Sequence, residues 1–219
     1  PGEEGFRELV RILGDGYDNA EISLNFGAML RECIRVEDLA REMLYSPVLS
    51  KLFRRIEDPM FEVQSDAWST FKELVLRHHR AMVAEFLGAN FGGFFDKYNA
   101  LLASENYVVR RQSLKLLAEL LLDRHNTAVM LRYVSDVENL KLIMNLLKSS
   151  SRAIQFEAFH VFKVFVANPN KPQAVREILA CNREKLLDYL REFHTDKEEG
   201  NDQFRSEKEV VMREIQQVQ

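Results

Sequence analysis

The residues with the clearest potential for chemistry are two adjacent histidines, His78 and His79, and a short stretch at residues 14–18 (GDGYD). Two histidines form a metal site only with further ligands, and adjacent residues of a helix point about 100° apart. No Cys, Asp or Glu ligand set surrounds this pair. The stretch at 14–18 lacks the alternating ligands and terminal Glu of an EF-hand, so we interpret it as a turn between helices.

Catalytic motifs are absent as well. The chain has no phosphate-binding P-loop, no G-x-G-x-x-G, no G-x-S-x-G and no H-E-x-x-H. Its two cysteines, Cys33 and Cys181, are too few for a disulfide framework, which is typical of a reducing compartment. Cys33 lies on an apolar helix stripe, where a packing role is expected. We therefore predict a cytoplasmic protein that is not an enzyme and has no cofactor and no metal site.

The remaining chemistry is recognition. Two helical segments carry basic and aromatic side chains on the face opposite their apolar stripe, and neither face contains an acidic residue. The residues are Tyr107, Arg111 and Lys115 in one segment, and Arg152, Phe156, His160 and Lys163 in the other. This pattern favours a groove for an acidic or carboxylate-ended peptide with an aromatic anchor. The alternative is that the aromatic rings pack on neighbouring helices and the basic side chains are only solvated.

The elements that position these residues are helices in a repeat. The 219 residues include only 9 Gly and 5 Pro, which suits a nearly all-helical chain. Four long apolar stripes begin at Ile22, Val63, Val109 and Ile154, which are 41, 46 and 45 residues apart. Their apolar positions recur at offsets that share one helix face. Periods in the forties predict an all-α, right-handed, armadillo- or HEAT-like solenoid rather than a four-helix bundle.

Shorter helical patterns fill the intervals between the long helices. Residues 36–57, 78–102 and 127–149 each contain two, and single helices are expected at 171–180 and 183–194. The polar stretch 195–203 is predicted to be a flexible linker, followed by a terminal helix at 204–219. We expect residues 1–219 to form one helical-repeat domain, the C-terminal portion of a longer scaffold, since the chain begins with Pro1 instead of Met.

Composition limits the partners. The net charge of −4, from 30 basic and 34 acidic residues, is unlike that of a nucleic-acid-binding domain. No apolar run approaches the roughly 20 residues of a membrane span. An importin-like adaptor for basic signals would need an acidic groove lined with Trp and Asn, whereas this face is basic and the only tryptophan is Trp68.

Several stretches resemble one known family closely. They are MLRECIR (29–35), SENYV (104–108), RQSLKLL (111–117), ELLLDRHN (119–126), ENLKL (138–142) and IQFEAFHVFKVFVANPNK (154–171). Together they resemble the mouse-protein-twenty-five scaffold family, also called calcium-binding-protein-thirty-nine-like. The resemblance runs from about Leu9 to the last helix.

The resemblance implies a non-catalytic scaffold. Family members bind a pseudokinase adaptor and, with it, a liver-type tumour-suppressor kinase, and they bind sterile-twenty-like kinases directly. A C-terminal pocket takes a Trp-Glu-Phe-type tail of the partner, and the concave face holds the kinase domain in its active conformation. The alternative is an adaptor that binds linear peptide motifs without activating a kinase.

The resemblance also assigns residues. The pocket methionine of the family matches Met144 and a neighbouring basic residue matches Lys141. The arginines of the concave face match Arg111 and Arg124. Thr127 stands where the family has a phenylalanine that contacts the kinase, and loss of such an aromatic anchor can cost on the order of 2 kcal/mol in an interface.

Overall fold

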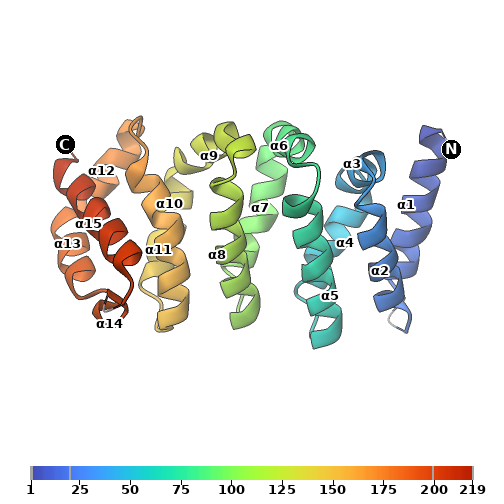
Figure 1. Cartoon of the computed structure of the whole chain (residues 1–219), viewed down its shortest axis with the longest axis horizontal. Coiled ribbons are helices and arrows are strands. Elements are labelled where there is room, and N and C mark those ends of the chain that lie inside the picture. Colours follow the sequence, from blue (N-terminus) through green and yellow to red (C-terminus); the bar gives the residue numbers. More distant parts are fainter. Residues whose placement is uncertain (1, 20, 199, 219) are drawn as a thin grey trace. The chain divides into compact units, whose positions relative to one another are not determined.

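The computed structural model describes residues 2–19, 21–198 and 200–218. Regular structure in these ranges is helical throughout, with no strand, so the predicted all-α helical-repeat class is confirmed. The α-helices range from 4 to 16 residues, and short loops separate them (Figure 1). The chain divides into two compact units, unit 1 (residues 1–129) and unit 2 (residues 130–219). The prediction of one continuous domain stays a prediction.

Unit 1 repeats a pattern of one long helix followed by two shorter helices. Its elements are α1 (Glu3–Tyr17), α2 (Ser23–Cys33), α3 (Glu37–Tyr45), α4 (Pro47–Arg55), α5 (Phe61–Lys72), the π-helical turn η1 (Glu73–Arg77), α6 (Arg80–Ala89), α7 (Phe91–Leu102), α8 (Tyr107–Leu121) and the 3-10 turn η2 (Arg124–Asn126). Figure 1 shows α2, α5 and α8 in front and α4 and α7 behind them. Three of the four predicted long helices are therefore present in unit 1, and all three lie in the same layer.

Unit 2 contains the fourth long helix. Its elements are α10 (Val137–Leu147), α11 (Arg152–Ala167), α12 (Gln173–Cys181), α13 (Arg183–Glu192), α14 (Thr195–Glu198) and α15 (Asp202–Gln217), while α9 (Thr127–Val134) crosses the boundary between the units. The long helix α11 packs on α10 and on α15. The two helices expected near 171–180 and 183–194 are α12 and α13.

Aromatic residues fill the core of unit 1. Phe71 and Phe94 lie with ring centroids 6.2 Å apart, and Tyr98 stacks on Phe94 at 5.8 Å. The Tyr98 hydroxyl donates a hydrogen bond of 2.9 Å to the carbonyl oxygen of Ser113, so the buried phenol joins α7 to α8. Burial of such rings supplies the main stabilisation of helix packing.

A charged contact joins α2 to α5 at a glycine. The Asp66 carboxylate accepts hydrogen bonds from Arg31 Nη1 at 2.6 Å and from the Tyr17 hydroxyl at 3.1 Å. A Cβ added to Gly27 would lie 1.9 Å from Asp66 Oδ2. Glycine at this position therefore leaves the space that the carboxylate occupies.

Two details of the N-terminal region differ from expectation. Residues 14–17 belong to α1 instead of an interhelical turn. A Cβ at Gly16 would lie 2.3 Å from the Phe26 ring, so glycine serves close packing of α1 on α2 and not a turn. Ile22, the first residue of its predicted apolar stripe, is exposed and precedes α2, which begins at Ser23.

The stretch 195–203, predicted to be a flexible linker, contains the short helix α14 at residues 195–198, and its role as a linker stays a prediction. Lys208 Nζ explains the order of this segment, since it reaches back from α15. It donates to the carbonyl oxygen of Phe193 at 2.9 Å and pairs with the Glu198 carboxylate. The terminal helix expected from residue 204 begins at Asp202 and ends at Gln217; Gln219 lies outside the described residues.

Candidate partner-binding surface

The first half of the predicted surface is the exposed face of α8. The Asn106 side chain starts this helix by accepting hydrogen bonds from the backbone N–H groups of Val108 (2.9 Å) and Val109 (3.4 Å). Residues four apart then fall on one face. Tyr107, Arg111 and Lys115 are all exposed on that face, as predicted. We call these three residues the α8 stripe.

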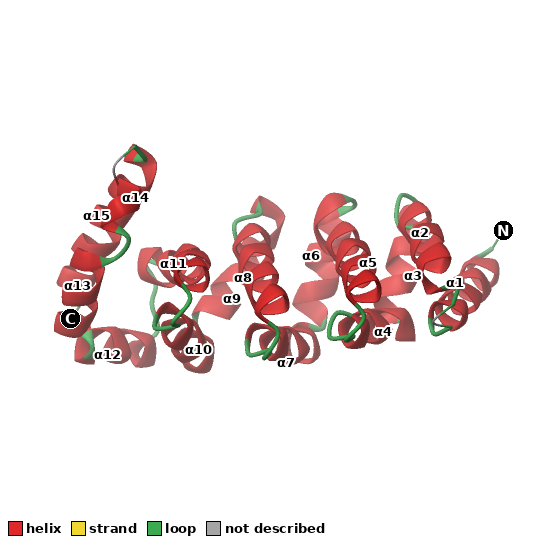
Figure 2. Cartoon of the chain, turned by 90° about the horizontal axis from the view of Figure 1, so that it is seen from below, coloured by secondary structure: helices red, strands yellow, loops and turns green. Residues whose placement is uncertain are grey.

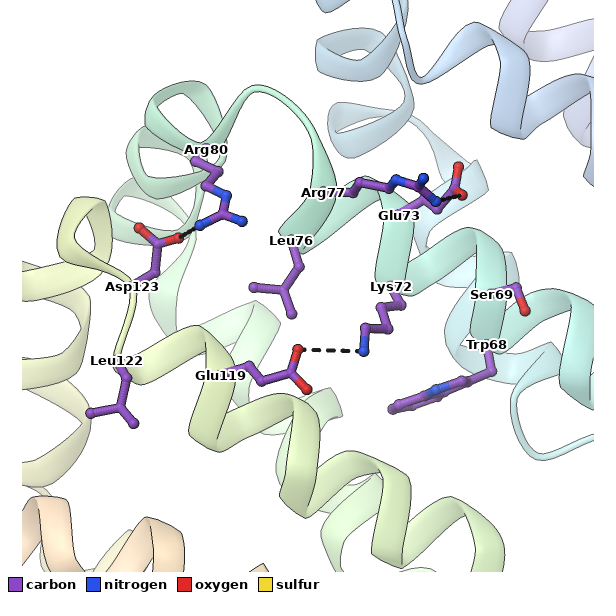
Figure 3. A pocket seen from close by; sticks show the side chains of 10 residues that line it. All are labelled: Trp68, Ser69, Lys72, Glu73, Leu76, Arg77, Arg80, Glu119, Leu122 and Asp123. Carbon is purple, nitrogen blue, oxygen red and sulfur yellow. Dashed lines mark hydrogen bonds and ion pairs between the residues drawn. The ribbon is translucent and has the colours of Figure 1, made fainter. Parts of the chain in front are cut away.

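A pocket beside the α8 stripe was not expected from the sequence. It has a volume of about 630 Å³ and lies between α5 with η1 and the C-terminal half of α8 (Figure 3). Trp68 lines one side and Leu122 another, with the Leu122 side chain largely exposed. Lys72 Nζ lies 3.4 Å from Glu119 Oε2 across the pocket. Glu119 lies four residues after Lys115 and therefore on the same helix face as the α8 stripe. This spacing is the sequence signal that could have indicated the pocket.

The acidic residues of this pocket are held by neighbouring cations. Asp123 pairs with Arg80 at 2.8 Å, and Glu73 pairs with Arg77 at 2.9 Å (Figure 3). Burial alone raises the pKa of Asp123, but hydrogen bonds from the backbone and ring of His125 and the charge of Arg80 outweigh it and lower the pKa. The pocket is therefore lined both by ion pairs and by the apolar side chains of Trp68, Leu76 and Leu122.

Arg124 and Thr127 lie at the turn after α8. Asp123 caps the turn by accepting a 2.9 Å hydrogen bond from the His125 backbone N–H. Both Arg124 and Thr127 are exposed, and the Thr127 hydroxyl donates to the Arg124 carbonyl oxygen at 2.9 Å. The threonine hydroxyl thus has a structural role in the turn.

Lys141 and Met144 lie on α10 in unit 2. This helix is capped by Asp136, whose carboxylate accepts from the backbone N–H of Glu138 at 2.7 Å. Lys141 is exposed and pairs with Glu138 at 2.7 Å. Met144 is buried, with 7% of its surface exposed. A role for Met144 in binding would therefore use a small exposed portion of an otherwise packed side chain.

The second half of the predicted surface, on α11, is covered by the C-terminal helices of its own unit. The centroid of the Phe156 ring lies 5.4 Å from that of Phe204 and 4.6 Å from Lys197 Nζ. Lys163 Nζ pairs with Glu207 Oε2 at 2.7 Å, and His160 Nδ1 lies 3.9 Å from the same oxygen. Sequence inspection found no acidic residue on this face because the acid comes from α15.

Arg152 is engaged as well, although it remains exposed. It pairs with the Asp196 carboxylate of α14 and lies 3.5 Å from His194 Nδ1. The structure thus brings Arg152, Phe156, His160 and Lys163 together, as predicted, but each has an intramolecular partner. The packing of the Phe156 ring on Phe204 of α15 agrees with one part of the alternative considered above, in which the aromatic rings pack on neighbouring helices.

Burial and charge shift the titration of this covered face. Burial lowers the pKa of His160, and the Lys163 ammonium lowers it further, against a weaker opposite effect of Glu207. For Glu207, burial raises the pKa, but hydrogen bonds from Lys163 and Gln203 outweigh it and lower the pKa. The packing of α15 on α11 therefore favours neutral His160 and ionised Glu207.

The histidines and cysteines singled out at first have structural surroundings. His79 Nε2 lies 3.0 Å from the Ile34 carbonyl oxygen and 3.2 Å from that of Arg35, at the end of α2. Cys33 is half-buried and not fully within the core as expected; burial and the nearby Glu32 charge raise the pKa of its thiol. In the described ranges, no group of three or more His, Cys, Asp and Glu side chains is placed to hold a metal ion.

Within the described ranges, none of the helices combines the length and the apolar character that crossing a bilayer requires. The stacked helices of both units define a protein of the helical-repeat class. A profile of the Mo25-like family matches residues 5–219, and the chain belongs to that family.

Relatives agree with this assignment. The chain is 56% identical over 208 residues to the degreening-related gene dee76 protein of Auxenochlorella protothecoides, covering 95% of this chain and 64% of the relative. It is 50% identical over 207 residues to human calcium-binding protein 39-like (94% and 61%), and 47% identical over 211 residues to the Mo25-like protein of Schizosaccharomyces pombe (96% and 64%). The chain therefore spans about three-fifths of the length of these relatives.

A solved structure shares the fold. The crystal structure of an engineered protein superposes with a TM-score of 0.60 at 12% identity, covering 99% of this chain and 85% of the other. At that identity the likeness concerns the fold alone.

Proposed function

We propose that this protein is a non-catalytic scaffold that binds a protein kinase or pseudokinase and stabilises its active conformation. The partner would be a sterile-twenty-like kinase or a liver-type kinase with its pseudokinase adaptor. The observation that carries the proposal is the exposed α8 stripe of Tyr107, Arg111 and Lys115 in a chain of the Mo25-like family.

The proposed mechanism is a population shift. A scaffold that binds the closed kinase conformation more tightly than the open one stabilises the closed form by that difference in binding free energy. The α8 stripe suits this role because it presents an aromatic ring and two cations without an acidic residue between them. Tyrosine and arginine, together with tryptophan, are enriched among the residues that dominate interface energetics.

A second contact would tether the partner. We assign Lys141 and Met144 to a site for an acidic, aromatic tail of the Trp-Glu-Phe type, in line with the resemblance. A bound tail raises the effective concentration of the kinase domain at the α8 stripe, so two weak contacts act as one stronger contact. Phe156, His160 and Lys163 of α11 are secondary contacts in this proposal, because a partner reaches their covered atoms only after α15 moves. Arg152 is also secondary, since it is exposed but already pairs with Asp196 of α14.

Kinase activation tests the main proposal. We expect Arg111→Ala to reduce stimulation of a sterile-twenty-like kinase by about tenfold, since truncation of an arginine hot spot costs 1–2 kcal/mol or more. Arg176→Ala on α12 is the matched control, because Arg176 is exposed and lies outside the proposed surface. Equal stimulation by the Arg111→Ala and Arg176→Ala proteins would refute the assignment. If the kinase is not stimulated by the unaltered protein but the tail peptide still binds, the peptide-adaptor alternative holds instead.

Tail binding is measured by fluorescence polarisation with a labelled peptide that ends in Trp-Glu-Phe. Lys141→Ala should weaken binding several-fold, whereas Lys148→Ala, an exposed lysine at the end of the same helix, should not. Met144→Ala should abolish binding, but it also creates a cavity whose cost is about 2–5 kcal/mol, so its circular dichroism spectrum must be recorded alongside. Unchanged affinity in both the Lys141 and Met144 variants would exclude this site.

Thr127 provides a test of partner choice. Thr127→Phe restores the aromatic residue expected from the resemblance at an exposed position, and we expect stronger binding of a sterile-twenty-like kinase. The substitution also removes the hydrogen bond to the Arg124 carbonyl, so Thr127→Val serves as the control that loses the hydroxyl without adding a ring. Equal or weaker binding by Thr127→Phe than by Thr127→Val would indicate a different partner surface.

A further inference from the structure

A groove on the other side of unit 1 has no part in the proposed function. Its lining residues come from α3, α4, α6 and α7, and it has a volume of about 350 Å³. Figure 2 shows two of these helices, α4 and α7, below α5 and α8. The apolar walls of the groove include Tyr45, Phe53, Phe86 and Phe94. The Tyr45 and Phe86 rings meet edge to face with centroids 4.9 Å apart, yet more than half of the Tyr45 surface is exposed. The volume is at the lower end of the range for ligand pockets, and suits one large side chain rather than a helix.

The groove carries a positive charge and no negative charge among its lining residues. Lys97 is the only charged residue among those lining it, and Lys97 Nζ donates a 2.8 Å hydrogen bond to the Ser50 hydroxyl. Lys97 has no ion pair among the described residues, unlike the cations of the pocket beside the α8 stripe. An acidic group in an occupant would therefore complement this rim without displacing an intramolecular carboxylate.

One glycine, Gly93, lines the groove, and two more lie close to its lining residues in the sequence. Gly92 and Gly93 form part of the first turn of α7, and Gly88 lies near the end of α6. A Cβ added at any of the three would meet no atom within 4 Å, and none of the three has a left-handed backbone conformation. Glycine in a helix is less stable than alanine, so neither packing nor backbone geometry within this chain accounts for these residues. Open space at Gly93 leaves room for another backbone to approach the groove from outside.

We infer that this groove docks an extended, acidic segment of a partner protein through one aromatic or leucine side chain. The apolar anchor enters between Tyr45 and Phe94, and a neighbouring carboxylate of the segment pairs with Lys97. The backbone of the segment passes over Gly92 and Gly93, where no side chain blocks it. This contact is separate from both surfaces of the proposed function, and it does not depend on kinase activation.

Amide chemical shifts of the glycines report directly on this groove. The whole nitrogen-15-labelled chain is titrated with the capped peptide acetyl-Asp-Asp-Phe-Asp-Asp-amide, which has no free carboxylate terminus. The chain has only 9 glycines, so their amide signals are few, and Gly92→Ala and Gly93→Ala identify two of them by loss. We expect saturable shifts at Gly93 and at its neighbour Gly92 with the acidic peptide. A peptide with Ser for Phe, and one with Lys for each Asp, should give none.

Substitutions then test the mode of docking. Lys97→Glu should weaken binding of the acidic peptide about three- to tenfold, because the substitution replaces a surface ion pair with a repulsion. Lys185→Glu, an equal charge change at an exposed lysine of α13, is the control and should have no effect. Gly93→Leu should keep the fold, because space is open there, and should abolish the shifts. The inference is wrong if the glycine signals do not shift, if the Lys peptide shifts them equally, or if Lys97→Glu and Lys185→Glu behave alike.

Discussion

The covering of α11 by α15 depends on Phe204, and truncation of that side chain is the sharpest test of it. Phe204 is 2% exposed, and its ring lies 5.4 Å from Phe156, 5.5 Å from Phe159 and 6.3 Å from Phe193. Truncation of a buried phenylalanine to alanine typically costs about 3–5 kcal/mol. Because three aromatic neighbours lose contact at once, we expect a value in the upper part of that range for Phe204→Ala.

Hydrogen exchange followed by mass spectrometry measures this effect locally. A loss of about 3 kcal/mol in the free energy of opening raises exchange by at least about 100-fold where α15 opens independently. Peptides that cover α15 should therefore exchange much faster in Phe204→Ala, while peptides that cover α8 in unit 1 should not change. Release of α15 would also uncover Phe156, His160 and Lys163.

Val210→Ala is the matched control for this experiment. Val210 lies on the same helix but is 48% exposed, so its truncation should change stability by less than about 0.5 kcal/mol. The reasoning is refuted if α15 keeps its protection in Phe204→Ala. It is also refuted if α8 and α15 lose protection to the same extent, since α15 would then be inseparable from the rest of the chain.

Three further predictions concern stability. Gly27→Ala should lower the free energy of unfolding by about 1–3 kcal/mol, because the new Cβ would lie 1.9 Å from Asp66 Oδ2. Urea denaturation measures this change, and a midpoint equal to that of the unaltered protein would contradict the packing of α2 on α5. Gly92→Ala should raise the free energy of unfolding by about 0.4–1 kcal/mol in thermal melts, since space and backbone conformation both admit alanine; a lower melting temperature would show a constraint not visible around Gly92. Acidification should loosen α15: the pKa values of His160 and His194 are lowered in the folded chain, so the unfolded chain binds more protons and stability falls as the pH drops below their usual value of 6.5. Exchange of α15 amides, corrected for the intrinsic rate, should rise between pH 7 and pH 5.5, and His160→Gln combined with His194→Gln should reduce this rise; an equal rise in that double variant would assign the effect to other groups.

Helix periodicity predicted most of the architecture. The stripes that begin at Val63, Val109 and Ile154 correspond to α5 with η1, α8 and α11, and the paired shorter patterns correspond to the helices between them. These predictions succeed because an apolar face recurring at 3.6 residues must be buried, and residues near in sequence determine it. The exposed character of Tyr107, Arg111 and Lys115 follows from the same periodicity.

The departures share a different cause, which is contact between distant segments. The glycines of residues 14–18 indicated a turn, but Gly16 lies in a helix against the Phe26 ring. The polar residues of 195–203 did not indicate helix α14, whose Glu198 carboxylate pairs with Lys208. The pocket between Trp68 and Glu119 joins two helices of different repeats. Helix periodicity reports which face is buried, and it does not report which distant residue covers it.

The sequence by itself determined an all-α repeat protein of a recognisable family, without a metal or catalytic motif, and with two basic and aromatic helix faces. Only the tertiary structure decided which of these faces stays open. The α8 stripe remains exposed, whereas Lys163 of α11 lies 2.7 Å from Glu207, a residue 44 positions further along the chain. The physical reason is that a helix face needs only local spacing to form, but its charge depends on whichever segment the fold packs against it.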